Sequence, residues 1–385
     1  MPLSPSIESI LGRLLALTVV GPVAYSQCMA TPVIDWTIAL NTAKKLVKPG
    51  PDISREGAAA VVAELRDCAN RAEAYVTQVT GLETPSNTSP VLVVDRQRWI
   101  QANLDGFRQV LRPLTAKAAD KLSGSNPAMT QIGSRVTGME VGALLSYLAT
   151  KVLGQFDPFY PGAEGEPGGR LLLVAPNIVS VERELEINPA DFRLWVCLHE
   201  ETHRVQFAAV PWLRDYMNAQ INAIVSTTEL DAAALLHMLG DAVARILEAL
   251  RNNEEISVVD LVQTPAQRAI IDRITAVMSL LEGHADVVMD GVGPDVIPTV
   301  EQIRAKFTVR RQGQGFDKVI RKLLGLDAKM RQYRDGAEFC RHVISAVGMD
   351  GLNKVWTSPE TLPSRAEIRH PAQWLARIHP EPAAA

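Results

Sequence analysis

The motif His199-Glu200-Glu201-Thr202-His203 constrains this chain more than any other feature of its sequence. Two histidines four residues apart lie one above the other on one face of an α-helix, about 40° apart around its axis. Their ring nitrogens can then bind one Zn²⁺ together, at roughly 2.0–2.1 Å each. Glu200 projects about 100° away from His199, where its carboxylate can hold a water molecule beside the metal. The pattern H-E-x-x-H within a helix is typical of zinc-dependent hydrolases.

The residues around the motif predict such a helix. Asn188 is a capping residue, Pro189 follows at the first helical position, and Asp191 adds an acidic side chain in the first turn. The segment 192–210 contains no glycine or proline, and Pro211 ends it. The motif therefore falls in the middle of a helix, where the spacing of its side chains is fixed.

Two histidines leave zinc short of a protein ligand, and the segment 278–286 offers candidates within a helix predicted over about 265–289. We predict Glu282 as the third ligand, because two histidines and a glutamate form an established catalytic zinc set. Asp286 shares a helical face with Glu282 and is expected to accept the second ring N–H of a ligand histidine. His284 lies about 200° around the same helix. It is the alternative ligand, and otherwise a core histidine or a hydrogen-bond donor to the transition state.

Several further stretches strengthen this interpretation by their resemblance to a known family. They are Pro176-Asn177-Ile178, Asp191 to Trp195, the motif with its extension to Phe207, Pro211 to Arg214, Glu282 to Asp286, Val292-Gly293-Pro294 and Leu323 to Met330. Together they resemble the zincin-like metallopeptidase type 2 family, in the bacterial branch labelled as associated with biosynthesis of the deazaflavin coenzyme. The resemblance covers about residue 30 to the end. It implies a largely helical zincin with zinc on His199 and His203 and with Glu200 as the catalytic glutamate.

We expect a mainly α protein with a zincin-like metallohydrolase core, a small β-sheet and an N-terminal helical layer. The expected regions are an N-terminal helical region over 29–160 and a catalytic region over 161–385, which could form one compact unit. Helices are predicted at 34–47, 54–81, 96–122 with a break at Pro113, 139–153, 212–226, 231–250, 299–311, 316–324 and 327–347. Segment 170–174 is predicted as a strand, and segment 155–169 as a linker at the rim of the active site.

Residues 1–28 fit this plan poorly. The apolar run 14–24 resembles the central region of a signal peptide and is too short to span a bilayer. We expect an over-long start and a cytoplasmic protein, with export as the alternative. Cys28, Cys68, Cys197 and Cys340 are far apart in sequence, which favours reduced thiols over a disulfide framework. Cys197 is predicted to serve packing only.

The charge of the chain limits the kinds of partner that it can attract. The formal net charge of −4 gives no broad attraction to nucleic acid or anionic membranes. The segment from Arg304 to Arg334 is locally basic, which indicates either a solvated helical face or a surface that attracts acidic substrates.

The predicted activity is hydrolysis of a peptide bond with one bound Zn²⁺ and with Glu200 as general base. Arg204, His284 and Tyr216 are candidate donors to the developing oxyanion. Leu172 to Val174 are expected to pair with an extended peptide if they form an exposed edge strand. Two alternatives remain: a zinc-containing scaffold or interaction protein without turnover, and a hydrolase of a small amide in coenzyme metabolism. The sequence indicates neither the identity of a peptide or protein substrate nor an oligomeric state.

Overall fold

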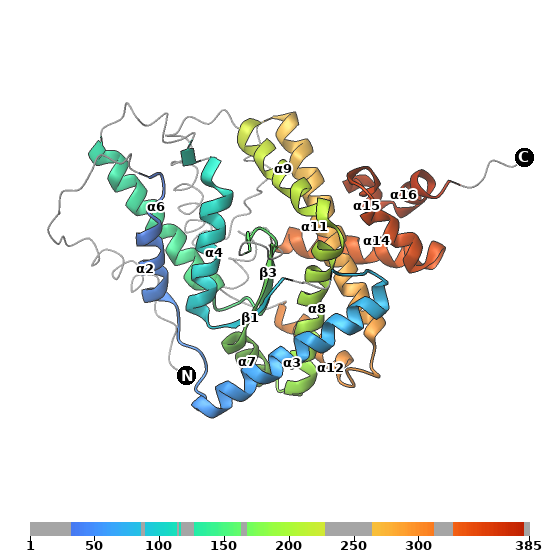
Figure 1. The fold of residues 1–385 in the computed structure, drawn as a ribbon, viewed down its shortest axis with the longest axis horizontal. Helices are drawn as coiled ribbons and strands as arrows, with labels where there is room; N and C mark the ends of the chain where they lie inside the picture. The colour runs from blue at the N-terminus through green and yellow to red at the C-terminus, as the bar shows by residue number, and fades with distance from the viewer. Residues whose placement is uncertain are drawn as a thin grey trace, which may run out of the picture.

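The computed structural model describes residues 32–85, 89–113, 115–116, 127–162, 168–227, 264–311 and 326–380, without the side chains of residues 127, 225, 227, 311 and 326–333. Helices dominate these residues, as the sequence predicts (Figure 1). The predicted helices at 231–250 and 316–324, the extension 1–28, Cys28, and residues 312–325 of the basic segment lie outside them. Among the described helices, none combines the length and the apolar character needed to cross a membrane.

The helices begin and end largely where local signals predict. In the first half of the chain, Ser54 caps α3 by accepting from Gly57 N, and Gly81 ends it with a φ of 65°. In the second half, Asn188 caps α8 by accepting from Asp191 N, and α11 begins with a capping box at Thr264. The helices are α2 (Trp36–Leu46), α3 (Arg55–Thr80), α4 (Arg96–Val110), α6 (Pro127–Leu148), α7 (Ala175–Glu184), α8 (Pro189–Ala209), α9 (Pro211–Thr227), α11 (Pro265–Val292), α12 (Val300–Arg311), α14 (Leu326–Leu352), α15 (Arg365–Arg369) and α16 (Pro371–Ile378), with short 3₁₀ turns at Asn353–Trp356 and Pro359–Thr361.

Three short strands form one sheet in the order β1-β3-β2. β3 (Arg170–Val174) is the predicted strand, and β1 (Val91–Val94) runs parallel to it. β2 (Gly154–Asp157) runs antiparallel on its other side. The sequence prediction missed β1 and β2 because each has only four residues, too few to show a clear alternation. Since β3 is the central strand, the expectation that it offers an exposed edge is wrong, and β2 is an edge strand instead.

The sheet separates two helical layers, because successive side chains of β3 point to opposite faces. Leu172 and Val174 belong to the core under α2, α4 and α6, which form the expected N-terminal helical layer. Leu171 and Leu173 belong to the cores on the other face, together with residues of α8 and α11. Figure 1 shows this division, with α2, α4 and α6 on the left and α8, α11 and α14 on the right.

The motif helix α8 is enclosed by other elements. It packs along α3, and it also contacts α11, β2 and β3. Cys197 is fully buried in this packing, and its thiol lies 3.7 Å from the Leu65 carbonyl oxygen of α3. Cys68 and Cys340 are also free and buried. The predicted packing role of Cys197 is therefore confirmed, and the helix that carries the histidines is fixed on several sides.

The helices α11 and α14 cross at a pair of glycines. A Cβ atom on Gly283 would collide with the backbone of Gly336 and Ala337, and one on Gly336 would collide with the backbone of Ser279. Backbone atoms in the middle of a helix cannot move aside as a flexible side chain can. At Gly283, α11 therefore closely approaches α14 and not the motif helix.

We expect Gly283→Ala to destabilise the protein by about 1–3 kcal/mol, because the added methyl group overpacks this crossing. Gly133→Ala in α6 is the matched control, since a Cβ there meets nothing within 4 Å. The control should be neutral or stabilising by up to about 1 kcal/mol. Urea unfolding of both variants measures the difference, and equal midpoints would contradict the backbone contact.

Candidate metal centre

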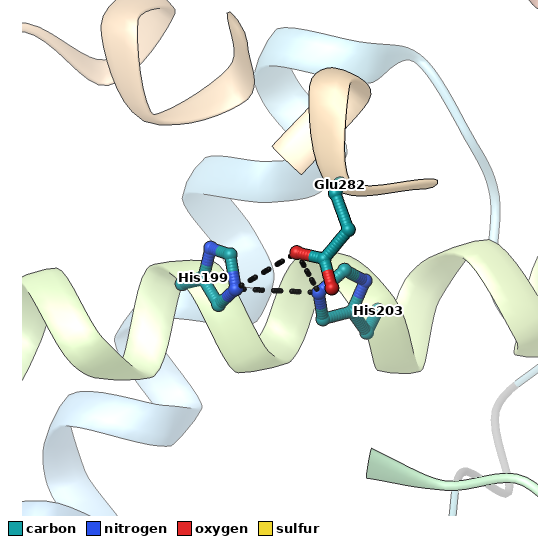
Figure 2. Close-up of side chains that lie close together, drawn as sticks. All are labelled: His199, His203 and Glu282. Atoms are coloured by element: carbon teal, nitrogen blue, oxygen red, sulfur yellow. Dashed lines mark hydrogen bonds and ion pairs between the residues drawn. The ribbon is translucent and has the colours of Figure 1, made fainter. Parts of the chain in front are cut away.

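Two helices bring the three predicted metal ligands together. His199 and His203 lie one turn apart on α8, and Glu282 reaches them from α11 (Figure 2). The two Nε2 atoms are 3.3 Å apart, and each is 3.5 Å from Oε2 of Glu282. Within the described part of the chain, these side chains form a cluster close enough to share one metal ion.

The distances fit zinc in particular. A tetrahedral ion with bonds of 2.0–2.1 Å holds its donor atoms about 3.3–3.4 Å apart. The three donor-to-donor distances here lie within about 0.2 Å of that value. One carboxylate and two imidazoles also leave one position of such an ion for water or substrate, as in catalytic zinc sites.

Glu200 lies beside the three ligands in a buried position, with 8% of the residue exposed. Burial is the main cause that raises the pKa of its carboxyl group; His203 opposes the shift, the charges of Glu282 and Glu201 add to it, and together they bring the pKa to about 7. A carboxyl group with a pKa near neutrality can both accept and return a proton at physiological pH. The position and environment of Glu200 therefore suit a general base.

Gly154, the first residue of β2, has no side chain and so leaves room for the side chain of Glu200. A Cβ atom on Gly154 would collide with Cγ, Cδ and Oε1 of the Glu200 side chain. The edge strand can therefore lie directly against the glutamate only because this residue has no side chain. The sequence analysis missed Gly154, and no local pattern marks it, because the contact joins a strand to a helix distant in sequence.

Gln206 determines the tautomer of His203. Its Nε2 group donates to the backbone carbonyl of Leu281, 3.0 Å away, and a carbonyl oxygen can only accept. The Oε1 atom must therefore face Nδ1 of His203, also at 3.0 Å, so Nδ1 carries the proton. In the neutral ring, the lone pair of His203 is then on Nε2, the atom that faces Glu282 and His199. Gln206 thus prepares His203 to bind a metal.

The protonation of His203 also depends on the carboxylate opposite it. Burial lowers the pKa of the imidazole, but its hydrogen bond and charge attraction to Glu282, assisted by Glu200 and Gln206, raise it to about 9. Without a metal, His203 is therefore cationic beside a carboxylate. A metal cation at this position would replace that proton.

His284 lies away from the metal ligands. It is fully buried, its ring packs edge-on against Trp356, and Gln206 Nε2 lies 2.9 Å from its Nδ1. Burial, followed by the charge of His203, lowers its pKa to about 3, so the ring is neutral. Of the roles considered for His284, the structure supports the core histidine. It does not bring His284 to the metal ligands or to the cleft.

Asp286 has a different partner from the one predicted. Its carboxylate pairs with Arg341 at 2.6 Å and with Arg304 at 3.6 Å, and it does not contact a ligand histidine. The prediction was wrong because Asp286 lies one turn beyond Glu282, toward α12 and α14. Gln206 provides the hydrogen bond to His203 instead. Gln206 lies three residues after His203, a spacing that places both on one helical face and could have indicated this contact.

The two remaining candidate donors are not placed to contact a substrate. Arg204 is buried and pairs with Glu201 at 2.5 Å and with Glu73 at 2.9 Å, which ties α8 to α3. Tyr216 packs edge-on against Trp212. Neither lines the cleft that contains the metal ligands. Their predicted role as oxyanion donors is therefore not supported by their positions.

That cleft has a volume of about 1420 Å³. One side is formed by residues 151–156 with Pro158 and Phe159, which include the edge strand β2 and the first part of the predicted rim. The other side is formed by residues of α11, α12 and α14. The cleft exceeds the roughly 300–1,000 Å³ typical of small-molecule sites, so a larger substrate fits it better.

Comparisons with known proteins identify the family of this chain and a solved structure that resembles it. The sequence model of the zincin-like metallopeptidase family matches residues 34–375. A solved structure from Chloroflexus aurantiacus, described as a candidate hydrolase with a novel fold, is 32% identical in sequence and aligns with a TM-score of 0.65. The alignment covers 91% of this chain and 100% of that one. A search of curated proteins gives no match.

Metal analysis of purified variants tests the ligand set. We expect one zinc ion per wild-type chain and, for Glu282→Gln, an affinity lower by at least about 100-fold, more than an outer partner contributes. His284→Ala should retain stoichiometric zinc, because its ring lies away from the ligands. Unfolding curves of the metal-free proteins separate binding from folding. Zinc retained in Glu282→Gln and lost in His284→Ala would reverse the assignment.

Replacement of Gln206 tests the tautomer argument. Gln206→Leu should weaken zinc binding by about 10- to 100-fold, since His203 loses the acceptor that orients its ring. Gln302→Leu on the exposed face of α12 is the control and should leave the affinity unchanged. Competition with a chromogenic chelator measures both dissociation constants. An affinity within twofold of the wild type would show that Gln206 does not prepare the ligand.

Proposed function

Because the chain belongs to the zincin-like metallopeptidase family, we propose that this hydrolase uses one zinc ion to cleave peptide bonds. The observation that carries the proposal is the donor triangle of His199, His203 and Glu282, with sides of 3.3, 3.5 and 3.5 Å. Glu200 completes the set of groups that hydrolysis requires. The solved structure described as a candidate hydrolase supports the reaction class.

Each protein group has a separate part in the proposed reaction. Zinc bound by His199, His203 and Glu282 would supply a Lewis acid that acidifies water and polarises a carbonyl group. Glu200 would accept the proton of the attacking water and pass it to the leaving amine. Its raised pKa, about 7, suits both transfers. The C–N bond breaks, and a carboxylic acid and an amine are the products.

The edge strand β2 is suited to hold an extended substrate. Among the strands that the structure describes, it pairs with β3 alone, and Gly154, Gln155 and Phe156 line the cleft beside Glu200. An edge strand presents backbone N–H and C=O groups that can pair with a peptide. We therefore transfer to β2 the strand-addition role that the sequence analysis assigned to Leu172–Val174. A backbone-paired substrate and a large cleft favour a peptide over a small amide.

Glu200→Gln tests the mechanism directly. We expect kcat/KM on a peptide library to fall by about 10²- to 10⁴-fold, because the amide cannot accept the proton, while one zinc per chain remains bound. Glu301→Gln, on the exposed face of α12 outside the cleft, is the matched control and should keep full activity. Removal of zinc with a chelator should abolish hydrolysis, and added zinc should restore it.

Two outcomes would contradict the proposal in different ways. Activity that survives Glu200→Gln would exclude Glu200 as the general base. Stoichiometric zinc without hydrolysis across broad peptide libraries would favour the zinc-containing scaffold. Hydrolysis of small amides but not of peptides would retain the chemistry and change the substrate.

A further inference from the structure

The wall of the cleft formed by α12 and α14 is rich in arginine. Its arginines, which we call the arginine wall, come from α12 and α14 and are Arg304, Arg310, Arg334 and Arg341. Apart from the ligand Glu282, the acidic residues that line this wall in the described part of the chain are Asp286 and Glu338. The whole chain has a net charge of −4, so the arginine wall is a local feature that overall composition does not explain.

A network of ion pairs fixes two of these arginines next to the metal ligands. Asp286 and Asp290 follow Glu282 by one and two turns of α11. Arg304 lies 2.6 Å from Asp290, and Arg341 lies 2.6 Å from Asp286 and 2.9 Å from Asp290. Four residues of α-helix rise about 6 Å, so the network begins about that far along α11 from the ligand. The guanidinium groups are therefore held in place before any substrate arrives.

Arg341 retains free binding capacity within this network. Both of its ion pairs use the same atom, Nη2, so its Nη1 and Nε groups have no partner among the described residues. Half of its side chain is exposed, against 31% for Arg304, which uses both Nη1 and Nη2. A guanidinium with one edge anchored and another open can bind a carboxylate through two parallel hydrogen bonds.

Arg334 extends the wall along α14. It lies seven residues before Arg341, which places both on the same helical face. Its side chain is exposed and has no ion-pair partner among the described residues. Arg310, by contrast, pairs with Glu184 at 3.2 Å. Arg341 and Arg334 are therefore the arginines of this wall whose guanidinium N–H groups are available to a ligand.

We propose that the arginine wall is a subsite for a substrate carboxylate, with Arg341 as its main contact, so that the enzyme acts on acidic peptides. The inference rests on the proposed function and adds its substrate class. An extended peptide advances about 3.3 Å per residue, so the 6 Å offset along α11 corresponds to about two residues. The carboxylate belongs to an Asp or Glu side chain, or to the peptide C-terminus, within about two residues of the cleaved bond.

Binding to the Glu200→Gln protein with zinc tests the subsite without turnover. The probes are fluorescein-labelled alanine hexapeptides with one Glu or one Gln at each position, each made as the free acid and as the C-terminal amide. We expect about ten- to hundredfold tighter binding of the Glu member at one or two positions, as for a charge-assisted hydrogen-bonded pair. If the C-terminus is the source, the free acid and not the Glu position produces the difference.

Variants of the wall identify the contact. Arg341→Gln in the same background should remove most of the preference, and Arg341→Glu should reverse it in favour of a Lys-containing hexapeptide. Arg334→Gln leaves the ion-pair network intact and should reduce the preference by a smaller factor. Arg365→Gln is the control, because Arg365 pairs with Asp272 outside the cleft and should not change binding.

The outcomes separate this inference from the proposed function. Hydrolysis with no preference between Glu and Gln probes, or a preference that both Arg341→Gln and Arg334→Gln retain, would overturn the carboxylate subsite and leave the hydrolase standing. A charge preference that depends on Arg341, together with no hydrolysis by the wild-type protein, would support the subsite and contradict the hydrolase.

Discussion

The contact between α8 and α11 is the constraint on which the site depends. Two imidazoles one turn apart on a helix can approach a metal, but they do not complete its coordination. Glu282 supplies the missing donor only because α11 lies at a distance that puts its Oε2 3.5 Å from both Nε2 atoms. A partly buried carboxylate beside a buried imidazole needs a compensating positive charge. In this structure a proton on His203 meets that need, and a metal ion would meet it equally well.

The elements behind this contact hold it in place. On one side, α14 packs against α11 at Gly283 and Gly336, where neither helix carries a Cβ atom. Between α8 and α11, Gln206 bonds to His203 on its own helix and to the Leu281 carbonyl on the other. The same amide therefore orients the ring of the ligand His203 and connects the two helices. The glycine crossing fixes the backbone position of α11, and the Gln206 side chain links a ligand ring to the backbone of that helix.

The two walls of the cleft offer different kinds of contact to a substrate. The β2 wall offers the unpaired edge of a strand and lies against Glu200, so it suits recognition of a peptide backbone. The other wall offers side chains, and two of its arginines, Arg304 and Arg341, are oriented by Asp286 and Asp290. This division explains why Asp286 is near the metal ligands without contacting them. It positions the cations of a wall and not the rings of the ligands.

The sequence alone determined the features that depend on interactions between residues close together in the chain. The spacing of His199 and His203, the capping residues of α3 and α8, and the strand Arg170–Val174 all follow from interactions within a few residues of each other. Helical angles also indicated that Glu282 and His284 point away from each other, and the prediction of Glu282 rested on the known zinc set of two histidines and a glutamate. Tertiary structure decided the rest. The central place of β3, the space that Gly154 leaves for Glu200, the bond from Gln206 to Leu281 and the pairing of Asp286 with Arg341 each join residues from different elements. Their proximity depends on how helices and strands pack, and no short-range pattern records that packing.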